Sequence, residues 1–425
     1  MRKILHSADI HLDSPLQKLG TYEQAPVERI RGASRRALES MVDLAIDQTV
    51  DLVVVAGDLY DGDWHDQNTG LFFVAQATRL VQAGIPVLVI RGNHDAANVM
   101  TSSLPLPLNP DGSEIMLGSD QVDQRVFEDL GIAIHGRSFR TRAETENLAS
   151  SYPAPISGMF NLGMLHTSLT GAEGHDSYSP CTPAQLTDKQ YDYWALGHVH
   201  TRGEFTLEGG APIHFCGNIQ GRHIRESGPK GCLIVEIDDR NQCDTQFHEL
   251  DIVRWMVCRL DVTGLQHIDA VTDAFQAWLH ETLPSAGDRL LVVRVELVGQ
   301  SELNQLLRQK HKQVRASMQA VTVAQGRERV WLEDCKIRTT IPEQGIQHAE
   351  LEGPLESLSS VIDEMKNDPT TGDTIQEELQ SLLRKLPTEL SEIDALPVHQ
   401  SQWTEEIVES AAAEILGRLQ KGATE

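Results

Sequence analysis

The chain has 425 residues, more than one hydrophobic core usually spans, so two or three domains are expected. With 40% hydrophobic and 23% charged residues the composition is that of a globular protein, which argues against a collagen-like, coiled-coil or globally disordered chain. A formal net charge of -26, from 36 basic and 62 acidic residues, opposes long-range attraction to nucleic acid or to an anionic membrane.

In the first 250 residues, short apolar runs alternate with turns rich in Gly, Asp, Asn or His and with helical stretches. Strands are predicted near 52–56, 85–90, 132–135, 162–165 and 194–196, and helices over 26–48 and 69–83. Buried strands that alternate with helices indicate an α/β domain. Polar residues follow the strands directly, at the ends where the loops of open α/β sheets form ligand sites.

From residue 251 the pattern changes to that of a smaller α+β module. Strands are predicted over 252–262, 290–298 and 330–337, and helices over 268–283 and 302–317. Beyond Pro342 the chain is acidic and predicted to be helical, with five basic and eighteen acidic residues, a balance of -13. The expected parts are therefore an α/β domain at 1–250, a small α+β capping domain at 251–340 and an acidic helical region at 341–425.

Side chains that bind metals recur at the predicted strand ends, in the order D-x-H, G-D, G-N-H-D, H and G-H-x-H. They are Asp9, His11, Asp58, Asn93, His166, His198 and His200. Carboxylates, a carboxamide and imidazoles without thiolates suit Mn²⁺, Fe or Zn²⁺ better than Ca²⁺. Seven ligands are too many for one such ion but suffice for two ions that share a carboxylate, an arrangement that clamps a phosphodiester during hydrolysis. Each motif alone is usually a turn or a cap, whereas all five in this order predict a two-metal site.

This order of motifs resembles that of the calcineurin-like metallophosphoesterases over roughly the first 220 residues. Four longer strings are similar to those of the SbcD-like DNA repair exonucleases, especially the bacterial YhaO branch. They are HSADIHLDSP at 6–15, HDSYSPC at 175–181, YWALGH at 193–198 and GNIQGRH at 217–223. The resemblance implies a metallophosphoesterase β-sandwich flanked by helices, and a two-metal nuclease that is usually most active with Mn²⁺.

Carried over position by position, the resemblance assigns three residues to each ion and one residue to both. Asp9, His11 and His200 would hold one ion, Asn93, His166 and His198 would hold the other, and Asp58 would bridge them. His94 has no place among the ligands, and we expect it to donate a proton or hydrogen bond to the leaving oxygen or to the charged phosphorane. Asp95 either orients a neighbouring imidazole or caps the turn.

One position departs from the archaeal and eukaryotic relatives, which carry a His three residues after the bridging Asp. Here that position is Asp61. The change leaves the ligand set intact but puts exonuclease activity on duplex ends in doubt. His65 either substitutes for the missing His or is an exposed loop residue.

A basic stretch offers a place for DNA on this acidic chain. Residues 308–338 contain eight basic and three acidic side chains, a local balance of +5. The candidate phosphate contacts are Arg308, Lys312 and Arg315, which would share one helix face, and Arg222 and His223 in a Gly-rich turn. The alternatives are a solvated helix surface for the first group and a structural turn for the second.

The acidic region carries amphipathic runs that either pack onto their own domain or bind a partner. Members of the family often work with an SMC-type ATPase that has a long coiled coil, and an acidic helix pair could grip the root of that coil. A homodimer is a further possible assembly.

The cellular setting follows from the cysteines and from the apolar runs. The six cysteines stand singly, without C-x-x-C spacing, which favours a reducing compartment. Too few apolar residues follow the first Met for a signal peptide, and no apolar run approaches the roughly 18 residues of a membrane span. We therefore expect a cytoplasmic protein with no membrane partner.

The sequence thus predicts a Mn²⁺-dependent DNA exonuclease or endonuclease that acts in DNA repair by hydrolysing phosphodiester bonds. The alternatives are a small-molecule phosphodiesterase or phosphatase, and a subunit that tethers DNA ends or regulates an SMC-like ATPase. The charge of -26 does not exclude DNA, because half of it belongs to the acidic region from Pro342. Strand polarity, the preferred DNA end, the balance of exonuclease and endonuclease activity and the physiological metal stay open.

Overall fold

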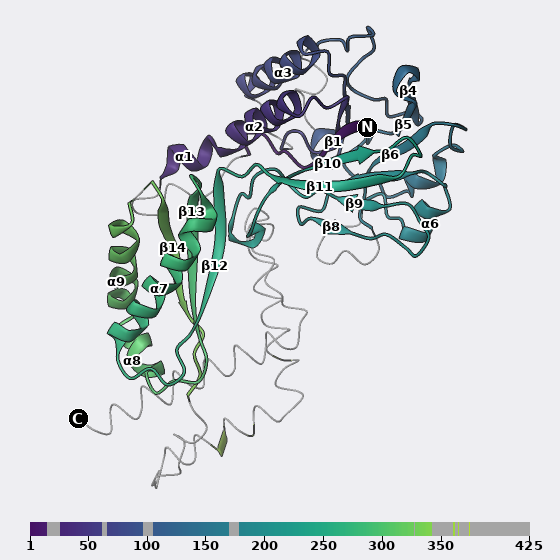
Figure 1. The fold of residues 1–425 in the computed structure, drawn as a ribbon. Coiled ribbons are helices and arrows are strands. Elements are labelled where there is room, and N and C mark those ends of the chain that lie inside the picture. Colours follow the sequence, from purple (N-terminus) through teal and green to yellow (C-terminus); the bar gives the residue numbers. More distant parts are fainter. Residues whose placement is uncertain are drawn as a thin grey trace, which may run out of the picture. The chain divides into compact units, whose positions relative to one another are not determined.

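The computed structural model describes residues 1–14, 26–61, 66–96, 105–169, 178–326 and 328–341, together with residues 360, 361, 364 and 374 (Figure 1). The chain forms two compact units. The first consists of residues 1–259, 275–296 and 315–336, and the described part of the second consists of residues 260–274, 297–314 and those from 337 onward. His65 and, apart from the few positions given above, the predicted acidic helices lie outside the described residues.

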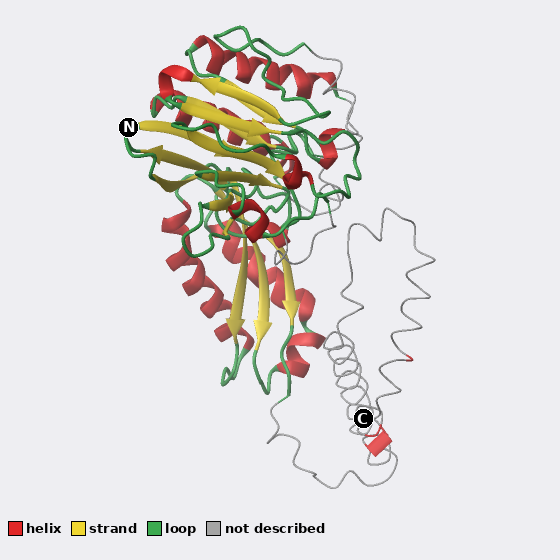
Figure 2. Ribbon diagram, turned by 90° about the vertical axis from the view of Figure 1, so that its right-hand side faces the viewer, coloured by secondary structure: helices red, strands yellow, loops and turns green. Residues whose placement is uncertain are grey.

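Two stacked β-sheets make up most of the first unit (Figure 2). The first sheet has the order β11-β10-β1-β2-β3, in which β1, β2 and β3 are parallel and β10 and β11 pair antiparallel. The second has the order β4-β5-β6-β7-β9-β8, with antiparallel β4 and β8 at the edges of a parallel centre. The strands of the first sheet are β1 (Arg2–Ser7), β2 (Leu52–Ala56), β3 (Val87–Ile90), β10 (Gly231–Ile237) and β11 (Cys243–Glu249). Those of the second are β4 (Asp123–Phe127), β5 (Ile132–Gly136), β6 (Phe160–His166), β7 (Tyr193–Gly197), β8 (Gly203–Glu204) and β9 (Ile213–Phe215).

Strand β2 shows why the sheets stack. Every residue of β2 is buried, and its side chains alternate between two cores. Val53 and Val55 pack with the helices on the outer face of the first sheet, whereas Val54 and Ala56 pack between the two sheets. Successive side chains of a strand point to opposite faces, so a continuous run of small apolar residues fills both cores.

Helices α2 (Ala33–Asp47) and α3 (Gln67–Gln82) cover the outer face of the first sheet (Figure 1). Leu38 of α2 and Phe73 of α3 enter the same core as Val53. The α/β sandwich flanked by helices that the sequence predicts is confirmed. The helix predicted over 26–48 is interrupted at Gly32, where ψ is 2°, so α1 (Val27–Arg31) precedes α2. Glycine is a poor helix former, which accounts for the break.

A three-stranded sheet follows, in the order β12-β13-β14. Its strands are β12 (Val253–Asp261), β13 (Leu290–Val298) and β14 (Val330–Ile337), and its helices are α7 (Ile268–Ala286), α8 (Asn304–Gln309) and α9 (His311–Ala324). The helix predicted over 302–317 is interrupted at Lys310, whose φ of -103° and ψ of 22° leave the helical range. Arg308 therefore lies on a different helix from Lys312 and Arg315, and the prediction that one helix face carries all three is wrong.

Short helical turns connect the strands of the first unit. They are α4 (Asn93–Ala96), η2 (Glu128–Leu130), η3 (Leu148–Ser151), α6 (Pro183–Thr187) and η4 (Ile224–Glu226). Among the described residues no helix combines the length and the apolar content needed to cross a membrane.

Candidate metal centre

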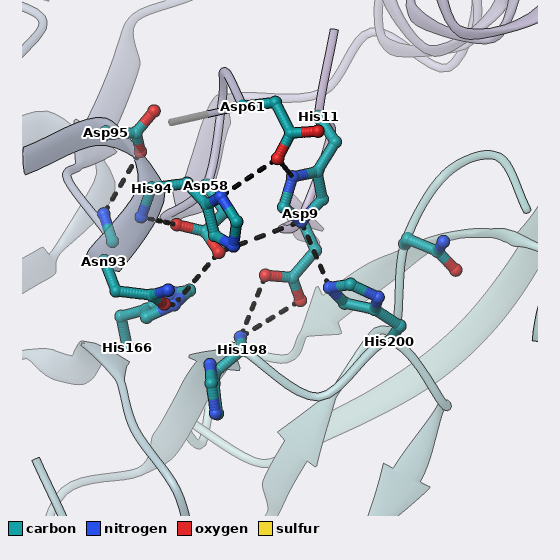
Figure 3. Close-up of polar contacts among 12 residues, drawn as sticks. Asp9, His11, Asp58, Asp61, Asn93, His94, Asp95, His166, His198 and His200 are labelled. Atoms are coloured by element: carbon teal, nitrogen blue, oxygen red, sulfur yellow. Dashed lines mark hydrogen bonds and ion pairs between the residues drawn. The ribbon is translucent and has the colours of Figure 1, made fainter. Parts of the chain in front are cut away.

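The seven predicted metal ligands lie together where loops from both sheets meet (Figure 3). In the first sheet, Asp9 and His11 follow β1, Asp58 follows β2, and Asn93 opens α4 after β3. In the second sheet, His166 ends β6, and His198 and His200 follow β7. All are buried except His200, which is half-buried. The parallel strands that carry them end at the same edge of the sandwich, which is why residues distant in sequence meet here.

The backbone at this edge is strained. Asp9, His11, Asp58 and His198 have φ angles of 50°, 44°, 52° and 104°, in a region that non-glycine residues rarely adopt. Backbone hydrogen bonds hold the first three, because Asp9 N–H donates to Gly57 O at 2.9 Å and His11 N–H to Asp58 O at 3.0 Å. Strain that the surrounding structure maintains is typical of functional sites.

The ligand atoms form overlapping groups that could each hold a cation. The groups are Asp9, His11 and His200; His11, Asp58 and His94; and Asp58, His166 and His198, with the ligand atoms of each group within 4.8 Å of one another. Asp58 Oδ2 lies between them, 3.8 Å from His11 Nε2 and 3.4 Å from His166 Nε2. Asn93 Oδ1 lies 3.0 Å from His166 Nε2. The carboxylate of Asp58 thus belongs to two of these three groups.

Three of the imidazoles are oriented by acceptors on their outer sides. His11 Nδ1 lies 3.2 Å from Asp61 Oδ1, His200 Nδ1 lies 2.7 Å from Glu226 Oε1, and His166 Nδ1 lies 2.9 Å from Ala56 O. Carbonyl and carboxylate oxygens accept only, so each Nδ1 carries a proton, and the neutral form of each ring presents its Nε2 lone pair to the site. Such outer partners are typical of metal-binding histidines.

The contact between His11 and His200 fits a cation. Their Nε2 atoms lie 3.1 Å apart. Burial, followed by the charge of Arg222, lowers the pKa of both imidazoles, which favours the neutral form of each. Two lone pairs at this distance repel each other unless a positive ion lies against both. Together with the nearby Asp9 carboxylate, this donor set has the chemistry of a site for a divalent transition metal.

Asp58 is held ionised at the centre. Burial alone raises its pKa, but the imidazole of His166, and after it those of His94 and His11, keep the pKa of Asp58 well below its ordinary value. Burial opposes protonation of His166, yet the carboxylate of Asp58 outweighs it and raises the pKa of His166 to about 9. The carboxylate expected to bridge the ions is therefore available as an anion.

Asp61 contacts both the predicted metal ligand His11 and His94, a role that was not predicted from the sequence. Asp61 Oδ1 lies 2.9 Å from His94 Nδ1 as well as 3.2 Å from His11 Nδ1. Burial raises the pKa of Asp61, but the hydrogen bonds with His11 and His94 reverse the shift and lower it far below the ordinary value. Burial lowers the pKa of His94, but the hydrogen bond with Asp61 outweighs burial, and the pKa of His94 is raised. The usable signal was a second carboxylate three residues after Asp58.

Asp95 takes the turn-capping role. Its carboxylate accepts from the backbone N–H groups of Leu59, Tyr60 and Gly92 at 3.0, 2.9 and 3.1 Å. Burial, with the nearby charge of Asp58, raises the pKa of Asp95 to about 6. The structure thus favours the second of the two predicted roles for Asp95, and the carboxylate that orients His94 is Asp61.

Gly92 permits the close packing of ligands. A Cβ atom at this position would lie 2.3 Å from Asp58 Oδ1 and 2.8 Å from His166 Nε2, both closer than real Cβ contacts. Only a residue without a side chain leaves the carboxylate and the imidazole where they are.

Of the predicted phosphate contacts, Arg222 reaches the site. Its Nε and Nη2 atoms lie 3.3 and 3.1 Å from Glu226 Oε1, and Nη1 lies 3.7 Å from Asp61 Oδ2. The neighbouring His223 exposes half of its side chain. Glu226 was not foreseen, because a single Glu in a loop, 26 residues after His200, carries no sequence signal.

The other predicted contacts lie on α8 and α9. Arg308 Nε donates to Asn304 Oδ1 at 3.2 Å, Arg315 Nη2 donates to Glu333 O at 3.4 Å, and Lys312 is exposed. Arg315 belongs to the first unit, whereas Arg308 and Lys312 belong to the second.

Comparison with known proteins agrees with the fold of the sandwich. The calcineurin-like phosphoesterase family matches residues 2–202, so this part of the chain is a calcineurin-like phosphoesterase domain. The middle domain of the metallophosphoesterase YhaO matches residues 255–340, and the resemblance to the YhaO branch is confirmed.

Two curated relatives illustrate the range. The chain is 34% identical over 270 residues to the uncharacterized metallophosphoesterase YhaO of Bacillus subtilis (strain 168), covering 63% of this chain and 65% of that protein. It is 29% identical over 221 residues to the DNA double-strand break repair protein Mre11 of Sulfurisphaera tokodaii, covering 51% and 53%. The chain thus spans between about half and two thirds of the length of these relatives. A solved dimetal phosphatase from Danio rerio aligns with 12% identity and a TM-score of 0.36, over 58% of this chain and 99% of that one.

Proposed function

We propose that this chain is a metal-dependent DNA nuclease that hydrolyses phosphodiester bonds at a two-metal centre and acts in DNA repair. The observation that carries the proposal is the pair of facing Nε2 atoms of His11 and His200, 3.1 Å apart beside a central ionised Asp58. The similarity to proteins named for DNA double-strand break repair supports DNA as the substrate. Imidazole, carboxylate and amide ligands suit Mn²⁺, Fe or Zn²⁺, and the family resemblance favours Mn²⁺ among these.

We assign the ligands to two ions as the sequence predicts. Asp9, His11 and His200 would hold one ion, Asn93, His166 and His198 the other, and Asp58 both. Two divalent ions bound there would neutralise phosphate charge and lower the pKa of a water molecule, which supplies the nucleophile.

His94 acts on the leaving group. Its Nδ1 is hydrogen-bonded to Asp61, so Nε2 is the nitrogen that donates a proton or hydrogen bond to the departing oxygen. Its side chain is 29% exposed, against 1% for that of His11, so a bound phosphodiester can reach it. The hydrogen bond to Asp61 raises the pKa of His94, which favours the protonated form that can donate.

DNA binding would rest on the basic side chains. Arg222 stands at the site with its guanidinium fixed by Glu226, and is suited to a phosphate next to the one that is cleaved. His223, Arg308, Lys312 and Arg315 are further candidates for contacts with the DNA backbone. We also propose that the chain works with an SMC-like ATPase, which would bind DNA more tightly than this chain does. We further propose a homodimer. A cytoplasmic location suits the six free cysteines.

The proposal is tested with the purified chain on labelled single-stranded and duplex DNA across Mn²⁺, Mg²⁺ and Zn²⁺. We expect cleavage with Mn²⁺, none by Asp58→Ala, and loss of most activity in His94→Ala with unchanged metal content. Hydrolysis of bis-p-nitrophenyl phosphate without any cleavage of DNA would instead favour a small-molecule phosphodiesterase. Loss of metal from His94→Ala would contradict the role given to His94.

A further inference from the structure

Glu226 connects the metal centre to the loop that carries Arg222. The residue is 7% exposed and ends the short helical turn η4. Its Oε1 atom accepts from His200 Nδ1 at 2.7 Å and from the Arg222 guanidinium at 3.1 Å. Its Oε2 atom accepts from Asn218 Nδ2 at 2.9 Å and from Arg222 N–H at 2.7 Å. A carboxylate is costly to bury unless donors surround it, and here donors reach both oxygens.

The bond from His200 to Glu226 decides which ring nitrogen of His200 carries the proton. With the proton on Nδ1, His200 presents the Nε2 lone pair toward Asp9 and His11. Arg222 Nη2 also lies 3.2 Å from His200 Nδ1, and a guanidinium could only donate to that nitrogen. Without the Glu226 acceptor, the tautomer with the proton on Nε2 therefore becomes accessible, and that form cannot bind a cation through Nε2. The carbonyl oxygen of His200 accepts from the buried Lys230 Nζ at 2.9 Å and from the backbone N–H of Asn218 at 3.3 Å. Glu226 therefore fixes the ring, while Lys230 and Asn218 hold the main chain.

We propose that Glu226 is a positioning residue of the metal centre. It holds His200 in the tautomer and orientation that complete the site with Asp9 and His11, and it fixes the Arg222 guanidinium beside the same site. The inference rests on the proposed metal-dependent function. It adds that Glu226 connects the ligands of one ion to the loop that carries Arg222. Outer partners of this kind commonly change metal affinity by about 10- to 100-fold when removed.

A purely structural role would leave metal binding unchanged. The bonds to Asn218 and to the backbone of Arg222 close the turn around residues 218–226, so a variant of Glu226 also loosens that turn. The control must therefore remove another buried, Arg-paired glutamate. Glu333 is 4% exposed and accepts from Arg294 Nε at 2.7 Å, which makes Glu333→Ala the matched control for Glu226→Ala.

The experiment is calorimetric titration of the full chain with Mn²⁺ alone. For Glu226→Ala we expect one of the two metal equivalents to bind about 10- to 100-fold more weakly, and Glu333→Ala to bind both as wild type does. Wild-type affinity for both equivalents in Glu226→Ala, or an equal loss in Glu333→Ala, overturns the proposal.

A second variant covers the case in which Glu226→Ala does not fold. Glu226→Gln keeps the side-chain volume and one acceptor oxygen, and should weaken the same equivalent by a smaller factor. Wild-type binding of both ions by Glu226→Gln overturns the proposal in that case. The titration needs no DNA, so it tests the role of Glu226 independently of cleavage. A wild-type chain that binds two ions but cleaves no DNA would contradict the nuclease function, and the titration of the variants would still decide the role of Glu226.

Discussion

Replacing Gly92 by Ala should disable the metal centre without removing any ligand. The new methyl carbon would lie 2.3 Å from Asp58 Oδ1, whereas ordinary contacts begin at 3.4 Å. The carboxylate or the backbone must therefore move by about 1 Å, several times the roughly 0.2 Å within which metal-ligand distances are held. Since the same methyl would press on the His166 ring, both the shared ligand and a ligand of the second ion are displaced.

We expect Gly92→Ala to weaken Mn²⁺ binding by at least about 100-fold, and overpacking to cost about 1–3 kcal/mol of unfolding free energy. Titration calorimetry measures the first quantity and urea unfolding the second. Gly118→Ala is the control, because there an added Cβ would meet only the Asp123 side chain, at 3.3 Å. Two equivalents bound by Gly92→Ala with wild-type affinity would refute the reasoning, since the close approach would then not constrain the ligands.

Three further predictions concern other contacts. Burial holds the pKa of His6 at about 3, so the unfolded chain takes up a proton below about pH 6.5 that the folded chain refuses, and stability falls as the pH falls. Between pH 7.5 and pH 5, urea unfolding should show that the wild type loses about 2 kcal/mol of unfolding free energy more than His6→Gln does. Equal losses in the two proteins would contradict the assignment of this loss to His6. Asp61→Ala should lower the kcat of DNA cleavage about 10- to 100-fold. The double variant Asp61→Ala/His94→Ala should have a kcat little below that of His94→Ala alone, because Asp61 acts through His94; if the two losses multiply, the two residues act independently. Lys312→Glu should reduce the salt dependence of DNA binding by a slope of about 1 while hydrolysis of bis-p-nitrophenyl phosphate is unchanged; an unchanged slope would remove Lys312 from the DNA surface.

The ligand set could be predicted because its members occupy strand ends. Short apolar runs followed by Asp, Asn or His are local patterns, and parallel strands that end at one edge bring these patterns together without further information. The bounds of β13 and β14 were predicted for the same reason, since alternating apolar residues specify a strand locally.

The partners of those ligands could not be predicted. Glu226 reaches His200 from the end of η4, and Asp61, in the loop after β2, pairs with His94 in α4. The contact of Glu226 leaves no periodicity or spacing in the sequence, and that of Asp61 leaves only its place three residues after Asp58, because both contacts depend on how the chain folds back. Asp95 shows the same limit: its position beside His94 suggested contact with an imidazole, but in α4 its carboxylate accepts from backbone N–H groups instead.

The division of the ligands between two sheets gives bound metal a mechanical role. His11 follows a strand of the first sheet and His200 a strand of the second, so an ion against both Nε2 atoms fastens the two layers at one edge. Ligands that bind only the folded state stabilise it, by about 2.7 kcal/mol when present at a hundredfold excess over the dissociation constant. Loss of metal would therefore also loosen the sandwich at this edge, besides ending the hydrolysis that we propose.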